Sequence, residues 1–110
     1  MITFKQYIFE GLKRPKTGMF KDHDGNKEWY QNGELHRLDG PAKEHADGYK
    51  AWYVNNKLHR LDGPAVEYAD GYKAWWINNE QFSETEFNAY KKQQEVKDAI
   101  SKNNTSGWDL

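Results

Sequence analysis

The sequence predicts a mainly β protein, in which a repeated unit builds an antiparallel meander between a short N-terminal helix and a C-terminal helix. The first observation is an internal repeat, because Leu58–Ala65 has the same sequence as Leu35–Ala42. The second is that pairs of turn-forming residues recur at the same period. The third is that the segments between those turns alternate in polarity, as the strands of a half-buried sheet do. A period of about 23 residues indicates an array of one small supersecondary unit.

Length and composition indicate a single small domain with a thin core. The chain has 110 residues, of which 36% are hydrophobic and 15% aromatic, so tryptophan and tyrosine must supply much of the buried area. A net charge of −1 argues against broad attraction to nucleic acid or to anionic membranes. The absence of cysteine excludes disulfides and thiolate metal sites. No apolar run approaches the length of a membrane span.

Residues 1–12 are expected to form a short amphipathic helix. Thr3 and Gln6 have the spacing of a capping box. Apolar residues then recur every four positions, at Phe4, Ile8 and Leu12. Residues 13–18 contain a proline and a glycine among polar residues, and this composition predicts a linker.

The β-repeat array is expected over residues 19–82. An Asp-Gly pair is the strongest two-residue signal for a β-hairpin, and three such pairs stand between strand-like segments, at Asp24-Gly25, Asp47-Gly48 and Asp70-Gly71. A second turn follows in each unit, at Asn32-Gly33, Asn55-Asn56 and Asn78-Asn79, because asparagine tolerates the left-handed region better than most residues. Each repeated Leu-Asp-Gly-Pro segment predicts a bend, since proline cannot donate to a strand ladder and glycine eases the corner.

A C-terminal helix is expected over residues 83–102, followed by a flexible polar tail at 103–110. Ser83 and Glu86 have the spacing of a capping box. A modest apolar stripe follows, at Phe87, Tyr90, Val96 and Ile100. A helix at this position would cover the open edge of the last unit, which has no neighbouring unit.

The first ten residues resemble the capsid-targeting peptide of internal head proteins in T-even-like tailed phages. In that family, the prohead protease cuts after a Leu/Ile-x-Glu triplet and before a small residue. The segment Ile8-Phe9-Glu10 fits the triplet, and Gly11 fits the small residue. The resemblance therefore implies packaging into the prohead and cleavage between Glu10 and Gly11.

The order of motifs within each unit resembles that of MORN repeats, in particular of their shorter variants. The resemblance covers about residues 19–82, where an Asp-Gly pair is followed by an aromatic pair and then by an Asn-rich turn and lysine or glutamate. The repeated Leu-His-Arg-Leu-Asp-Gly-Pro-Ala segment departs from ordinary MORN units and is similar to a repeat in many small phage proteins. The resemblance implies the β-repeat fold more than it implies a function.

Two His-Arg pairs, His36-Arg37 and His59-Arg60, recur at the repeat period. They could form a ladder that binds phosphate or carboxylate, because arginine offers a bidentate fork and histidine a further donor. Alternatively, each arginine pairs with the aspartate two residues later and holds the bend of its own unit. Recurrence favours this structural interpretation, since every unit needs whatever maintains its shape.

Two aromatic series are expected on opposite faces of the sheet, because adjacent strand residues point in opposite directions. One series is Trp29, Trp52 and Trp75, and the other is Tyr30, Tyr53 and Trp76. One series must contribute to the core, and any uncovered series would be a candidate partner-binding surface. Stacking of single-stranded nucleic acid on such a surface is disfavoured by the lack of a basic surround.

The sequence predicts no catalytic, cofactor or metal site, and we therefore expect a non-enzyme. Asp22, Asp24 and Asn26 have the spacing that begins a calcium loop, but Lys27 stands at the required glycine position. No nucleophile pair adjoins either histidine, and there is no phosphate-binding glycine loop.

The leading functional hypothesis is a phage internal head protein that lies inside the virion and then enters the host cytoplasm. There it would bind a host or defence protein. The alternative is a cytoplasmic phage inhibitor or adaptor that is not packaged, with the N-terminal helix only capping the array. A lipid-binding module of MORN type ranks lower because of the net charge. A homodimer is also compatible with the sequence, since a short array has open edges.

Overall fold

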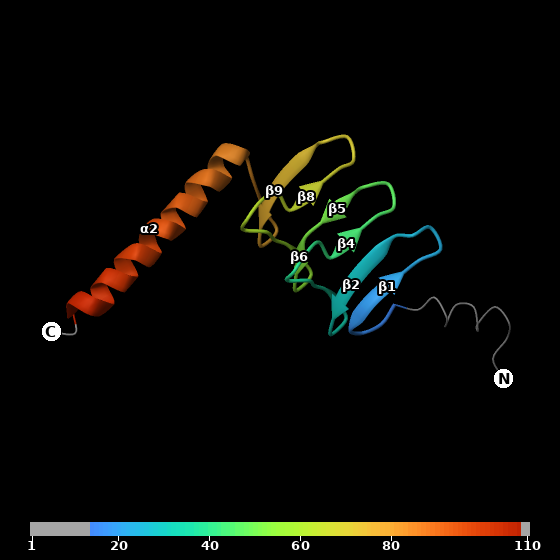
Figure 1. Cartoon of the computed structure of the whole chain (residues 1–110), viewed down its shortest axis with the longest axis horizontal. Coiled ribbons are helices and arrows are strands. Elements are labelled where there is room, and N and C mark those ends of the chain that lie inside the picture. The colour runs from blue at the N-terminus through green and yellow to red at the C-terminus, as the bar shows by residue number, and fades with distance from the viewer. Residues whose placement is uncertain (1–13, 109–110) are drawn as a thin grey trace.

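The computed structural model describes residues 14–108, which form an antiparallel β-sheet followed by one helix (Figure 1). This confirms the predicted mainly β meander with a C-terminal helix. The predicted helix at residues 1–12 and the processing site at Glu10 and Gly11 lie outside the described residues. The elements are β1 (Gly18–Lys21), β2 (Lys27–Gln31), β3 (Glu34–Leu35), β4 (Lys43–Glu44), β5 (Lys50–Ala51), β6 (Tyr53–Val54), β7 (Lys57–Leu58), β8 (Val66–Glu67), β9 (Lys73–Ile77), β10 (Glu80–Phe82) and α2 (Glu84–Trp108).

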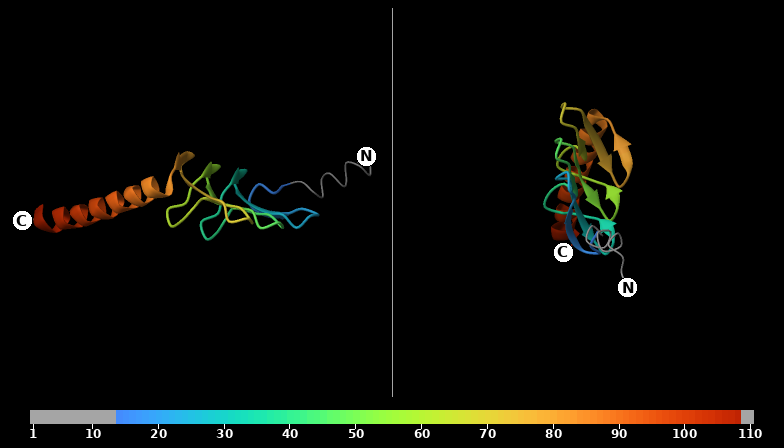
Figure 2. Two further views of the ribbon diagram at one scale, coloured as in Figure 1. Left: turned by 90° about the horizontal axis from the view of Figure 1, so that it is seen from above. Right: turned by 90° about the vertical axis from the view of Figure 1, so that its right-hand side faces the viewer.

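The strands follow one another across the sheet in the order β1-β2-β4-β5-β8-β9-β10. Each neighbouring pair is antiparallel. The remaining short strands form side hairpins, because β3 pairs with β2 and β6 pairs with β7. The result is a thin, single-layered sheet with its hairpins side by side (Figure 2).

The turns have the backbone conformations that their residues predict. The glycines of the three predicted hairpin turns have a positive φ, which is 88° at Gly25, 101° at Gly48 and 96° at Gly71. In the second turn, Asn55 and Asn56 have φ values of 50° and 68°, so both central residues lie in the left-handed region that twisted hairpins favour.

Backbone contacts between neighbouring hairpins recur at the period of the sequence repeat. The N–H of Arg37 donates to the carbonyl of Tyr53 at 3.1 Å, and the N–H of Arg60 donates to that of Trp76 at the same distance. A second pair of bonds, Asn56 to Leu35 and Asn79 to Leu58, follows the same spacing. The bend at Arg37 is thus bonded to β6, and the bend at Arg60 is bonded to β9.

The core is thin and consists mainly of small side chains. Its buried members are Ala42, Ala51, Ala65, Val66, Ala74, Ile77 and Phe87. On one face of the sheet, larger partly buried side chains, among them Tyr49, Tyr53 and Trp76, pack against Ala51, Val66 and Ala74. Aromatic rings therefore shield a floor of small residues within a single layer, as the composition predicted.

The helix α2 begins at the predicted capping box. The N–H of Ser83 donates to Glu86 Oε1 at 2.8 Å, and the N–H of Glu86 donates to Ser83 Oγ at 3.1 Å. The helix contacts β9 and β10, and its later part points away from the sheet (Figures 1 and 2). The helix ends at Trp108 and not at Lys102, so residues 103–108 are helical where a tail was predicted. Each added residue contributes a hydrogen bond once a helix has begun.

The predicted linker is tied to the sheet in its described part. The N–H of Gly33 donates to the Lys16 carbonyl at 2.7 Å, and the N–H of Asn32 donates to Thr17 Oγ1 at 3.1 Å. Gly18 already belongs to β1. Composition predicted only a linker here. It could not show that the N–H groups of Asn32 and Gly33, in a neighbouring turn, would donate to this segment.

Candidate binding surface

Each bend of the sheet is organised around an arginine that lies between a tryptophan ring and a glycine. The guanidinium carbon of Arg37 is 3.8 Å from the centroid of a Trp29 ring. On its other side, a Cβ added to Gly40 would lie 3.0 Å from the same carbon. Arg60 has the same arrangement with Trp52 and Gly63, at the same two distances. These glycines are needed for this close approach, and not only to ease a corner.

The same arginines are neutralised by nearby carboxylates, each arginine bonding to two of them. Arg37 Nε donates to Asp39 at 2.9 Å, and Nη1 donates to Glu44 at 3.0 Å and to the Pro41 carbonyl at 3.1 Å. Arg60 repeats these bonds with Asp62, Glu67 and Pro64. The predicted Arg–Asp pairing is therefore confirmed. The adjacent guanidinium holds the pKa of Asp39, and likewise that of Asp62, below its ordinary value.

The two histidines of the His-Arg pairs hold the neighbouring Asn-rich turns. The N–H of Asn55 donates to His36 Nδ1 at 3.0 Å, and the N–H of Asn78 donates to His59 Nδ1 at 3.2 Å. Because Nδ1 accepts in each case, the neutral ring carries its proton on Nε2. His36 and His59 therefore link one hairpin to the next.

A hollow of about 520 Å³ lies between the two bends. It brings Arg37 together with His59 and Arg60, over a floor that includes Trp52. His36 is not among its lining residues. Asp39 and Asp62 also line the hollow, so its lining contains both positive and negative groups. This arrangement lacks the excess positive charge that a phosphate site needs.

The two predicted aromatic series lie in different surroundings, and all six side chains are partly buried. Trp29 and Trp52 are covered by the guanidinium groups. Tyr53 and Trp76 belong to the opposite face, where they pack against the buried cluster of Ala51, Val66 and Ala74. Trp75 pairs across the strands with Phe82. Neither series is an open stripe, and their role in partner binding remains a prediction.

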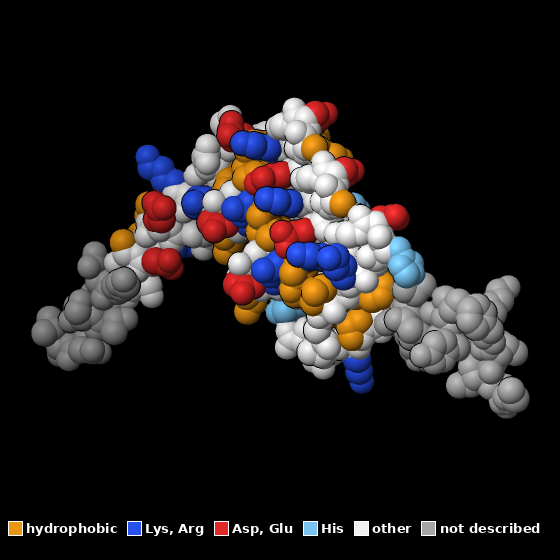
Figure 3. Space-filling view, turned by 45° about the vertical axis from the view of Figure 1, so that its right-hand side comes forward, with side chains coloured by type: hydrophobic (Ala, Val, Ile, Leu, Met, Phe, Trp, Pro, Cys, Tyr) orange, Lys and Arg blue, Asp and Glu red, His pale blue; other side chains and the backbone are white. Residues whose placement is uncertain are grey.

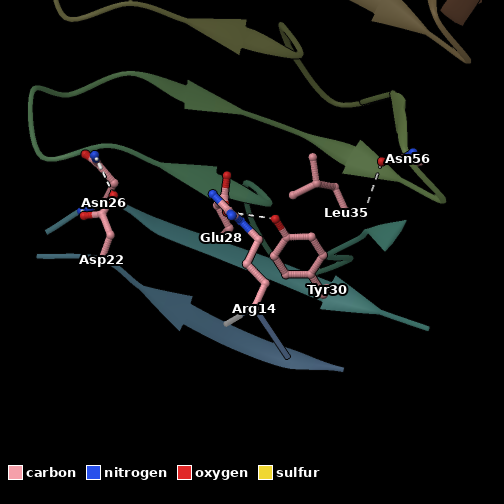
Figure 4. A network of polar contacts seen from close by, with 7 residues as sticks. All are labelled: Arg14, Asp22, Asn26, Glu28, Tyr30, Leu35 and Asn56. Carbon is pink, nitrogen blue, oxygen red and sulfur yellow. Dashed lines mark hydrogen bonds and ion pairs between the residues drawn. The ribbon is translucent and has the colours of Figure 1, made fainter. Parts of the chain in front are cut away.

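Tyr30 belongs to a small polar network at the start of the sheet (Figure 4). Its hydroxyl donates to Glu28 at 2.8 Å, and Arg14 Nε donates to the same carboxylate at 2.8 Å. Burial raises the pKa of the Tyr30 hydroxyl, and the bond to Glu28 raises it further. Burial opposes ionisation of Glu28, but the bonds from Arg14 and Tyr30 outweigh it and lower the pKa of this carboxyl. The network therefore fastens the segment before β1 to β2.

Four aromatic side chains lie in a row at the hairpin ends, two of them exposed and two half-buried, and this row was not predicted from the sequence. We call this the tip row, and its members are His45, Tyr49, Tyr68 and Tyr72. Consecutive rings have centroids 4.9, 5.0 and 5.4 Å apart. Tyr68 and Tyr72 are 46% and 57% exposed. The signal was present, because aromatic residues flank each of two Asp-Gly turns at the repeat period.

Charged side chains elsewhere on the sheet alternate in sign. Across the strands, Lys27 faces Glu44, which in turn faces Lys50, and the alternation continues through Glu67 and Lys73. In Figure 3, basic and acidic side chains are accordingly interspersed over the sheet and do not gather in separate patches. Cross-strand pairs of opposite charge stabilise a sheet modestly and leave this face without a basic patch.

No protein-family model matches the chain, and no curated protein or solved structure is significantly similar to it. Within residues 14–108, no helix is long and apolar enough to cross a bilayer. The same part of the chain contains no group of three His, Asp or Glu side chains placed to hold a metal ion.

Proposed function

We propose that this chain is a non-enzymatic internal head protein of a tailed phage, which binds a host or defence protein after delivery. Binding is supported by which side chains already have partners within the sheet and which side chains are exposed. The arginines and histidines of the bends are engaged in holding the sheet together, while aromatic rings remain exposed at the hairpin ends. Such a surface is suited to contact with another protein.

We further propose that the sheet is an array of MORN-like units, each one repeat period long. The sequence repeat and the recurrence of the Arg37 contacts at Arg60 support this. In such an array each unit buries its surface mainly against its neighbours. The proposed N-terminal helix would precede the array as a separate packaging signal.

Packaging and cleavage are tested by mass spectrometry of purified virions. We expect a chain that begins at Gly11. The Glu10→Gln variant should enter the particle but remain uncut, because the protease recognises the acidic residue. A wild-type chain that is uncut in the particle, or absent from it, would contradict the proposal.

The alternative is an unpackaged cytoplasmic inhibitor or adaptor in which residues 1–10 cap the array. Deleting these residues separates the two proposals. Under the packaging proposal the free energy of unfolding should not change, whereas removal of a cap should lower it. The tie between Arg14 and Glu28 supports the first, because it anchors the start of the sheet without residues 1–10. A lipid-binding role finds less support, since charges of both signs alternate on the strands.

A further inference from the structure

We propose that the tip row binds a proline-rich segment of the partner protein in the polyproline II conformation, with basic residues at every third position. The inference rests on the proposed function as a binding protein and specifies the chemistry of its partner. The tip row crosses four neighbouring strands, β4, β5, β8 and β9, at the ends nearest the Asp-Gly turns. A ligand that contacts all its rings must therefore run across the strands.

The spacing of the row matches that of a polyproline II helix. Tyr49 and Tyr72 are equivalent in the repeat and lie two strands apart, which corresponds to about 9.6 Å at the usual strand separation. A polyproline II helix has three residues per turn and advances about 9.3 Å in that turn. Every third side chain of such a ligand would therefore meet an equivalent position on the next hairpin.

The side chains of the row suit a proline-rich ligand. Proline-rich segments dock on surfaces lined by aromatic rings, because the ligand is already ordered and the rings offer flat apolar contacts. Tyr68 and Tyr72 are the most exposed members of the row, and their rings meet edge to face at an interplanar angle of 60°. Tyr49 packs against the buried cluster of Ala51, Val66 and Ala74, which supports the row from behind.

Acidic side chains beside the row select the charge of the ligand. Asp47 and Asp70 stand in the turns, and each accepts the N–H of the residue two positions later, Tyr49 or Tyr72, at 3.0 Å through Oδ1. This bond holds each carboxylate at the backbone of a tyrosine of the row and uses one of its two oxygens. The two aspartates repeat at the same two-strand interval as the rings. A ligand with lysine or arginine at every third position would therefore face both carboxylates, whereas the phosphates of a nucleic acid would be repelled.

The test measures binding of the full chain to three synthetic peptides by isothermal titration calorimetry. The first peptide has three Pro-Pro-Arg triplets. The second has three Pro-Pro-Glu triplets, which keep the conformation and reverse the charge. The third has three Gly-Gly-Arg triplets, which keep the charge and remove the polyproline II preference. We expect the first peptide to bind at least tenfold more tightly than either control. Equal binding of the first and third peptides, or no binding of the first, would overturn the proposal.

Variants of the chain locate the site. Tyr68→Ala with Tyr72→Ala should weaken binding at least fivefold, since a buried aromatic contact commonly contributes that much. Asp47→Asn with Asp70→Asn keeps the bond to the backbone N–H and should weaken binding and reduce its salt dependence. Leu38→Ala, at an exposed bend outside the row, is the matched control and should bind normally. Unchanged binding by the tyrosine variant would refute the assignment.

Two further measurements test whether the tip row binds nucleic acid instead and whether the packaging role stands independently of the ligand. Tighter binding of a twelve-residue oligothymidylate than of the Pro-Pro-Arg peptide would show that the row stacks bases, and would overturn the proposal. Virion mass spectrometry is independent of all these measurements. A chain that is packaged and cleaved between Glu10 and Gly11 but does not bind the peptides would contradict the ligand assignment alone. Peptide binding by a chain that is never packaged would contradict only the internal head role.

Discussion

Gly40 and Gly63 lie where the chain bends and where an arginine side chain needs space. Neither has a φ in the left-handed region, so backbone conformation does not demand glycine at these positions. The demand comes from the guanidinium groups of Arg37 and Arg60, each of which lies close to both a glycine and a tryptophan ring. Glycine is therefore needed at each of these positions because an arginine side chain lies against it.

Gly40→Ala should lower the free energy of unfolding by about 1–3 kcal/mol, the usual cost of overpacking. The added methyl group would lie 3.0 Å from the Arg37 guanidinium carbon, so this group must shift by a few tenths of an ångström against its other contacts. Urea denaturation measures the change. In an Arg37→Ala background the same substitution should cost almost nothing, because the opposing group is gone. An equal cost in both backgrounds would show that the contact is not the cause.

At the scale of elements, α2 packs closely against the strands near its start, whereas apolar side chains further along it are exposed. Phe87 is 2% exposed, and the rings of Phe82 and Tyr90 meet edge to face at 5.7 Å. Further along, Val96 and Ile100 are about half exposed. The helix thus covers the end of the sheet with its first turns and extends beyond it.

Phe87→Ala should destabilise the protein by about 3–5 kcal/mol, because it removes a large side chain from a buried site. Val96→Ala, on the extended part of the helix, should change stability by less than about 0.5 kcal/mol. Both are measured by urea denaturation. Phe87→Leu removes less volume and keeps the comparison possible where the alanine variant does not fold. Similar effects at positions 87 and 96 would mean that the packing is not confined to the first turns.

Local rules predicted the turns and the start of the helix, because a few neighbouring residues decide each of them. The Asp-Gly pairs, the Asn-rich turns and the capping box of Ser83 and Glu86 all belong to this class. The Arg–Asp pairs were also predictable, since two positions separate the partners. The end of α2 was not, because residues 103–107 have low helix propensities and predicted a tail where the helix continues.

The stacking of Arg37 on Trp29 and the tip row depend instead on which strands become neighbours. Arg37 lies eight positions after Trp29, and no local pattern shows that the bend returns the arginine to the ring. Tyr49 and Tyr68 meet because β5 pairs with β8 in one register. The candidate site therefore emerged only from the assembled sheet, whereas its repeat period was evident in the sequence.

At the scale of the whole molecule, stability depends on contacts between neighbouring hairpins. Among the described residues, most of the buried core consists of alanine, so the core is small. The connecting bonds instead recur from one hairpin to the next, as between Arg37 and Tyr53 and between Arg60 and Trp76. A structure held together in this way should tolerate the loss of an internal unit, provided that the register is kept.

Deleting residues 43–65 tests this directly, because it removes one full repeat period and joins Ala42 to Val66, the repeat equivalent of Lys43. We expect a folded protein with a cooperative transition and a smaller urea m-value, since less surface is exposed on unfolding. The control deletes residues 44–65. It shifts the following strands by one position, which turns every side chain to the wrong face, and it should abolish cooperative unfolding. Equal behaviour of the two deletions would contradict a sheet built from units of this period.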